Sequence, residues 1–154
     1  MNWVWTFYGL AQAMDDLTEV GASPVGSGIL QNAWMGLGQL GTPAPSPGLL
    51  IGDIVEANYD GYARQAVVWF PTFVALANAQ TVESHNLYFA PTDLTVPNTI
   101  TTIFLATALT GGALIMAAAL VPPFVITAPE AAMIVKAVFQ LPFTPTYGGP
   151  VVQV

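Results

Sequence analysis

The chain has 154 residues, of which 54% are hydrophobic and 7% charged, and its formal net charge is -7. This length suits one domain with a proper core, whereas soluble domains ordinarily carry about 25% charged residues. Other subunits or lipid must therefore cover much of the surface. Arg64 and Lys136 are the whole basic content, which excludes nucleic-acid binding through clustered cations.

The composition excludes cysteine chemistry, and the first residues argue against a signal peptide. The chain has no cysteine, so it has no disulfide framework, thiolate metal site or cysteine nucleophile. The stretch MNWVWTFYGL lacks the positively charged region of a signal peptide. We therefore expect no export signal.

Residues 1–28 are predicted to form a helix or arm. Apolar residues recur there at spacings of four and three, as on one face of an amphipathic helix that ends before Gly21: Trp3, Phe7, Leu10, Met14 and Leu17. One interpretation is an ordinary core helix, and the other is an aromatic arm that docks on a neighbouring subunit. Because one short helix usually buries fewer aromatic side chains, we predict interface contacts for the four in this segment: Trp3, Trp5, Phe7 and Tyr8.

From Ile29 onward the sequence is typical of a β protein. ILQNAWMGLGQL is a candidate strand, and TPAPSPG after it has three prolines in seven residues, which indicates an extended surface loop. GYARQAVVWF is predicted to be a strand whose two faces alternate. One face holds Tyr62, Arg64, Ala66, Val68 and Phe70, and the other holds Ala63, Gln65, Val67 and Trp69. Further strands are expected at 85–89, 124–127 and 133–141.

The segment between Asp93 and Glu130 has no charged residue, and ITTIFLATALTGGALIMAAALV is long enough to cross a bilayer as a helix. Frequent threonines favour β structure, and no Lys or Arg flanks the segment to orient it. Gly111-Gly112 at its centre indicates a hairpin, because glycine tolerates positive φ. We predict strands at about 101–109 and 113–120 joined by this Gly-Gly turn. A transmembrane helix around residues 100–121, in a small integral membrane protein, is the alternative.

The last strand shows a period of two. Its wholly apolar face is formed by Met133, Val135, Ala137, Phe139 and Leu141. Lys136 and Gln140 share the opposite face. Residues 144–154 are predicted to form an extended tail because prolines recur in them. Short strands separated by Gly and Pro turns predict a mainly β fold, a single antiparallel β-sandwich or jelly-roll-like domain over residues 29–143.

Catalytic signatures are missing from the sequence. The single histidine, His85, has no cysteine near it and is interpreted as a structural or surface residue. GxSxG, HExxH and phosphate-loop motifs do not occur. We therefore expect no enzyme activity, no catalytic residues, no cofactor and no metal.

One carboxylate cluster lies near a polar turn: Asp53, Glu56 and Asp60. Calcium binding is one interpretation, since that ion needs several oxygen ligands, although the spacing does not match an EF-hand loop. The favoured interpretation is that these carboxylates solvate the approach to the strand and pair with Arg64.

Two stretches resemble a known family. GLLIGDIVEANYDGYARQAV resembles a motif of small structural proteins from tailed bacteriophages, tail-fibre-like or minor capsid proteins, in which an Asp-x-x-x-Ala segment leads to an aromatic and then Gly-Tyr-Ala-Arg. LATALTGGALIMAAALVPPFVITAPEAAMIVKAVFQL is similar to the family's ending, a strand, a Thr-Gly-Gly-x-Leu hairpin, a Pro-bearing connection and a final strand. The resemblance covers roughly residues 29–143.

The resemblance implies a structural protein located in the virion, either a head decoration or minor capsid subunit or a tail-associated subunit. Its partners would be major capsid or tail proteins and copies of itself, with no nucleic acid and no membrane. In such a protein Arg64 is a tether, whose guanidinium locks the loop bearing Asp53, Glu56 or Asp60 onto the sheet. Gly61 would allow the tight turn into the strand.

Overall fold

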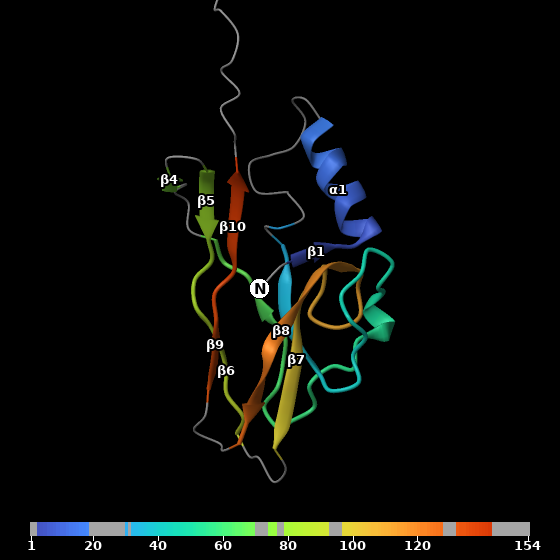
Figure 1. The fold of residues 1–154 in the computed structure, drawn as a ribbon, viewed down its shortest axis with the longest axis vertical. Helices are drawn as coiled ribbons and strands as arrows, with labels where there is room; N and C mark the ends of the chain where they lie inside the picture. The colour runs from blue at the N-terminus through green and yellow to red at the C-terminus, as the bar shows by residue number, and fades with distance from the viewer. Residues whose placement is uncertain are drawn as a thin grey trace, which may run out of the picture.

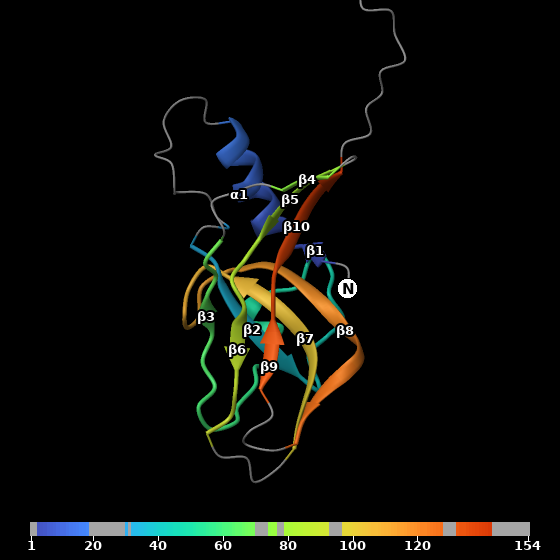
Figure 2. The ribbon, with the colours of Figure 1, turned by 90° about the vertical axis from the view of Figure 1, so that its left-hand side faces the viewer.

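The computed structural model describes residues 3–18, 30, 32–69, 74–76, 79–92, 97–127 and 132–142. These residues form a mainly β fold of antiparallel sheets, with one α-helix packed at one end (Figures 1 and 2). The predicted class, an antiparallel β-sandwich-like domain, is confirmed. The predicted tail, 144–154, lies outside the described residues.

The main sheet has five strands in the order β1-β8-β7-β2-β3. Their bounds are β1 Trp3–Trp5, β2 Trp34–Gln39, β3 Gln65–Ala66, β7 Asn98–Ala106 and β8 Leu114–Ile126. The central strand β7 pairs with β2 on one side, where Leu37 faces Ile103, and with β8 on the other, where Leu105 faces Met116. The three central strands carry most of the fully buried side chains because neighbours cover both of their faces.

A second layer consists of two small sheets. β6 (Leu87–Phe89) pairs with β9 (Met133–Val135), and β10 (Val138–Pro142), β5 (Ala79–Glu83) and β4 (Val74–Leu76) form the other sheet in that order. Figure 1 shows β6 and β9 beside the main sheet, while β5 and β10 continue beyond it at the top of the view. Met133, Val135 and Ala137 are buried and Ile134, Lys136 and Val138 exposed, as the predicted alternation requires.

The two faces of the main sheet bury separate hydrophobic clusters. Ile103 and Leu105 of β7 pack with Leu87 and Phe89 of the second layer. Phe104 and Ala106 point the other way, toward a loop that contains Leu49 and the short 3-10 helix η1 (Ile51–Asp53). Burial on both faces explains why residues 103–106 read as a continuous apolar run.

Residues 100–121 are not helical, so the transmembrane helix predicted as the alternative for them is wrong. They lie in β7, β8 and the loop between these strands. Among all the residues that the structure describes, no helix is long and apolar enough to cross a membrane.

The connection between β7 and β8 is longer than the Gly-Gly turn that the sequence predicted. β7 ends at Ala106 and β8 begins at Leu114, so the loop covers 107–113. Gly111 and Gly112 do adopt positive φ, 60° and 76°. The Thr107 amide donates to the Ala113 carbonyl at 3.0 Å and the Ala113 amide donates to the Thr107 hydroxyl at 2.9 Å, which closes a wide loop in place of a tight turn.

The expected strand at 124–127 is the end of β8, not a separate element after a proline connection. Ile100 pairs with Phe124 but Thr102 pairs with Ala119, so β8 bulges outward through Pro122-Pro123, where the Val121-Pro122 peptide is cis. β1 pairs only with residues 116–118. The prolines therefore lie along an edge, where a missing N–H leaves no pairing bond unmade.

The N-terminal prediction is partly wrong. Trp3–Trp5 is a strand of the main sheet, and helix α1 (Phe7–Thr18) begins only after it. The hydroxyl of Thr6 accepts from the Gly9 amide at 3.0 Å and so caps the helix. Phe7 and Leu10, from the predicted core face, are 71% and 50% exposed, whereas Gly9 faces β8 so closely that an added Cβ would lie 2.1 Å from a carbonyl oxygen. The expected boundary between residues 28 and 29 thus does not separate this segment from the sheet.

GYARQAVVWF is also less regular than predicted. β3 covers only Gln65 and Ala66 within it. Arg64 and Val67 are both buried, although they belong to opposite predicted faces. The alternation therefore shifts between them, because the segment leaves the loop on one face of the sheet and joins the core on the other.

Candidate functional site

Arg64 is a buried charged residue at the centre of a polar site. Gly61, with φ of 85°, turns the chain just before it. The residue is only 6% exposed. Its Nε and Nη2 donate to the two carboxylate oxygens of Glu56, each at 2.8 Å, which is the bidentate geometry that guanidinium favours.

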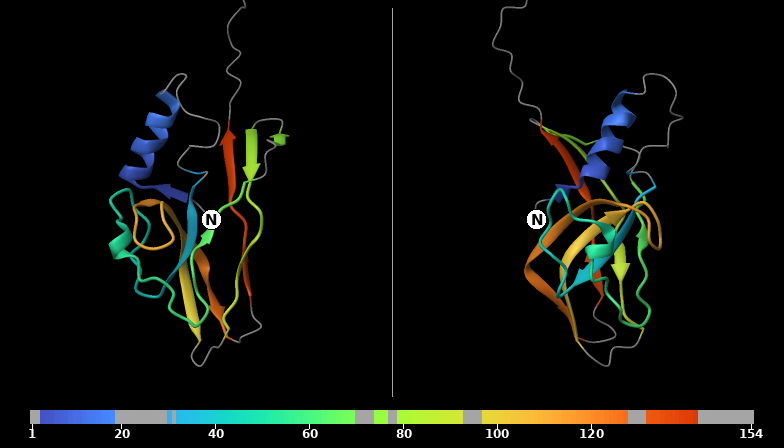
Figure 3. Two further views of the ribbon diagram at one scale, coloured as in Figure 1. Left: turned by 180° about the vertical axis from the view of Figure 1, so that it is seen from behind. Right: turned by 90° about the vertical axis from the view of Figure 1, so that its right-hand side faces the viewer.

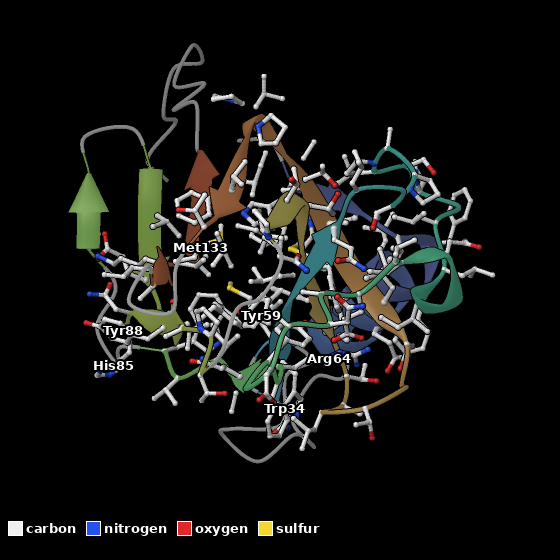
Figure 4. The ribbon with its side chains drawn as sticks, turned by 90° about the horizontal axis from the view of Figure 1, so that it is seen from below. Trp34, Tyr59, Arg64, His85, Tyr88 and Met133 are labelled. Carbon is white, nitrogen blue, oxygen red and sulfur yellow. The ribbon has the colours of Figure 1, made fainter. Side chains whose placement is uncertain are left out.

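The remaining donors of Arg64 reach the β7–β8 loop. Nη1 donates to the Ala108 carbonyl at 2.8 Å and to the Gly111 carbonyl at 2.7 Å. The guanidinium carbon also lies 5.2 Å from the centre of the Phe104 ring. Figure 4 shows Arg64 among the loops on one side of the main sheet, with Tyr88 and Met133 on the other. One side chain thus joins two loops that are far apart in the sequence.

Tyr62 extends this site and was not singled out from the sequence. Its hydroxyl donates to Glu56 Oε1 at 2.8 Å and accepts from the Leu37 amide at 3.0 Å. Burial raises the pKa of Tyr62, and the bond to the Glu56 carboxylate raises it further. The sequence feature that could have identified Tyr62 is its position two residues before Arg64, because this spacing places both side chains on one face of an extended segment.

The three carboxylates of the predicted cluster have different roles. Of these, Glu56 is the partner of Arg64. Asp53 is exposed and accepts from the Leu50 amide at 2.9 Å. Asp60 is exposed, and its backbone carbonyl accepts from the Thr92 amide at 2.9 Å. Within the described ranges, no three His, Cys, Asp or Glu side chains gather as metal ligands, so the structure does not assemble the calcium site considered above.

His85 lies at the edge of the second layer, far from Arg64 in Figure 4. It is exposed, and its backbone amide donates to the Val68 carbonyl at 2.8 Å. It therefore takes no part in the Arg64 site.

Tyr59 contrasts with Tyr62. It is 7% exposed, and its hydroxyl has no hydrogen-bond partner among the described residues. Burial raises the pKa of Tyr59 to about 12. Its ring packs edge-on against Tyr62, with centroids 5.4 Å apart. Tyr59 therefore contributes to the hydrophobic core through the packing of its ring.

A groove of about 610 Å³ lies where α1 begins, between the helix and the loop that carries η1. Apolar side chains dominate its wall, and three of them are well exposed: Phe7 by 71%, Leu50 by 67% and Tyr8 by 44%. The Phe7 amide donates to the Pro47 carbonyl at 2.9 Å and so ties the two walls together. We call this feature the α1 groove, and Figure 3 shows its helix and loop from two sides.

The four aromatic residues predicted at an interface divide into two pairs. Trp3 and Trp5 are half-buried and pack against the protein's own core. Phe7 and Tyr8 lie in the wall of the α1 groove and are exposed. Leu50, which the sequence analysis did not select, joins the second pair; the signal was the apolar run LLI inside a segment rich in Pro and Gly.

Comparison with known proteins adds no relative. No protein-family model matches the chain, and no curated protein matches it. The likeness to tailed-phage structural proteins stays a prediction from its two sequence stretches.

Proposed function

We propose that this protein is a structural subunit of a tailed-phage virion, placed on the head as a decoration or minor capsid protein or at the tail. It acts through contacts with other virion proteins and with copies of itself. The resemblance of the GYAR and TGG stretches supports this function.

The observation that carries the proposal is the apolar character of the exposed surface. Large hydrophobic side chains more than half exposed occur on α1, on the loops and on both layers: Phe7, Leu40, Leu50, Val68, Tyr88, Val121 and Ile134. Burying apolar surface contributes roughly 25 kcal/mol per 1,000 Å² before the costs of association are subtracted. With 7% charged residues, such a surface is suited to coverage by neighbours.

The Arg64 site fits the same function. All of its charged and polar groups are engaged with one another: the guanidinium with Glu56 and two carbonyls, and the carboxylate also with Tyr62. Such a site holds loops in place and offers no unpaired nucleophile or base for a reaction.

Quantitative mass spectrometry of purified particles of the virus that carries this gene tests the proposal. The chain should be present at a fixed ratio to the major capsid protein and stay bound through a salt wash, since apolar contacts are not screened. Its absence from intact particles, while it is present in the infected cell, would reject the proposal.

A further inference from the structure

We propose that the α1 groove receives the C-terminal segment, residues 143–154, of a second copy of this chain. This inference names the partner for one of the contacts of the proposed function and rests on that function for its biological setting. Two features carry this inference. One is an exposed groove with aromatic residues in its wall, and the other is the uncharged, proline-bearing sequence that follows β10.

The groove is suited to an extended apolar segment. Its volume, about 610 Å³, is that of a site able to take several side chains. Phe7 and Tyr8 supply aromatic surface, and Tyr8 also supplies a hydroxyl. Grooves lined by aromatic residues recur as sites for proline-rich extended segments.

The segment has matching chemistry. FTPTYGGPVVQV contains no charged residue and two prolines, with Phe143 and Tyr147 as large apolar side chains. Prolines restrict an unbound segment to extended conformations, so less conformational entropy is lost when it binds. The segment can therefore fill an apolar groove without leaving a charge unpaired.

Charge also favours this pair of surfaces. Each copy carries a formal charge of -7, so two copies repel wherever their carboxylates meet. The segment has no acidic side chain, and the one acidic residue in the groove wall, Asp53, has an oxygen engaged by the Leu50 amide. Contact at this place therefore brings no two acidic side chains together.

The position of β10 favours a second copy over the same chain. β10 ends at Pro142, at the top of the view in Figure 1, where it points away from the main sheet. The loop of the groove lies lower, beneath the start of α1. The described end of β10 thus points away from the groove of its own chain.

Cross-linking of the full chain tests the proposal directly, because the protein has no cysteine of its own. A Leu50→Cys copy is mixed with a Val152→Cys copy, and in a second mixture with a Tyr147→Cys copy, under mild oxidation. We expect disulfide-linked heterodimers in at least one mixture, identified by mass spectrometry. Leu40→Cys is the matched control, since Leu40 is 73% exposed and Leu50 67%, but Leu40 lies outside the groove.

Three outcomes would overturn the proposal. One is a yield no higher than that of the Leu40→Cys control in both mixtures. Another is an internal disulfide in the diluted Leu50→Cys/Val152→Cys double variant, which would mean that the segment occupies its own groove. The third is cross-linking of Leu50→Cys, in particles, to a different virion protein alone.

Association in solution supplies a second measurement. Sedimentation velocity of the full chain should show Leu50→Glu copies associating about 10-fold more weakly than wild type, since a charge would be buried in the contact. Leu40→Glu should associate like wild type, and a synthetic peptide of residues 143–154, but not a scrambled one, should dissociate wild-type oligomers. Equal association of both variants would contradict the proposal. Because these measurements use the isolated chain, they can fail or succeed independently of the particle test.

Discussion

The two faces of the main sheet are closed in different ways. On one face, regular strands of the second layer bring Leu87, Phe89, Met133 and Val135 against the sheet. On the other face, an irregular loop covers Phe104 and is held by hydrogen bonds of Arg64. The comparison teaches that a repeating apolar pattern suffices to close a face with strands, whereas a loop without a pattern depends on a few directional bonds.

The largest effect is expected on the strand-covered face. Phe89→Ala should lower the free energy of unfolding by about 3–5 kcal/mol, because it removes a ring that is 2% exposed and leaves a cavity. Urea denaturation followed by circular dichroism measures this loss. Leu40→Ala, at an exposed position, should change stability by less than about 0.5 kcal/mol. Similar losses for both would mean that the second layer does not close this face.

The loop-covered face is tested by the two basic residues. Arg64→Met should destabilise the fold by about 3 kcal/mol, because it keeps much of the side-chain volume but leaves Glu56 and two carbonyls without their donor. Lys136→Met is the matched change, since Lys136 pairs with Glu83 at the surface, and there the loss should stay below about 1 kcal/mol. Equal melting temperatures for the two variants would reject the tether.

Tyr62 and Tyr59 test separately whether a hydrogen-bonded hydroxyl stabilises the loop-covered face. Tyr62→Phe should lower stability by about 1–2 kcal/mol, because the Leu37 amide and Glu56 each lose a partner. Tyr59→Phe should change it by less than about 0.5 kcal/mol, since the Tyr59 hydroxyl has no partner among the described residues. The reverse order in chemical denaturation would show that the hydroxyl of Tyr59 is the one that supports the loop.

The smallest expected effect is a dependence on alkaline pH. The pKa of Tyr59 is raised to about 12, so the folded state holds this proton more tightly than the unfolded state, whose tyrosines titrate near 10. The contribution of the protonated Tyr59 hydroxyl to the free energy of unfolding is therefore complete below about pH 10 and decreases as pH rises toward 12. Between pH 8 and pH 10.5 the free energy of unfolding of the wild type should therefore fall by about 1 kcal/mol more than that of Tyr59→Phe. Parallel pH profiles for the two proteins would contradict this burial effect.

Parts of the fold and of the site were predictable from local patterns. The alternation over Met133, Val135 and Ala137 predicts the buried face of the segment at 133–141. The single strand predicted there is wrong, because the segment is divided into β9 and β10, which belong to different sheets. Gly111 and Gly112 mark the connection between β7 and β8, and both adopt positive φ. The bond of Arg64 to the preceding loop could be anticipated because a lone basic residue in an apolar segment needs an acceptor.

Other parts depend on neighbours that the sequence does not place. Trp3–Trp5 continues a pattern with helical spacing but forms a strand, because an open edge of β8 is there to pair with it. Pro122-Pro123 looks like a connection but lies in β8, since β1 does not extend that far and the edge needs no N–H. Local propensity yields to the tertiary partner in both cases.

The sequence by itself determined the mainly β class, a pair of strands on either side of Gly111-Gly112 and the need of Arg64 for a partner, because these follow from composition, period and glycine positions. The tertiary structure decided that Glu56, not Asp53 or Asp60, takes the guanidinium, and that the carbonyls of Ala108 and Gly111 share it. It also decided that Phe7 and Tyr8 face solvent while Trp3 and Trp5 pack inward. The physical reason is the distance along the chain over which each contact acts. The local sequence pattern indicates which side chains need burial or a hydrogen bond, but only the folded chain brings residues more than 40 positions apart within hydrogen-bond distance.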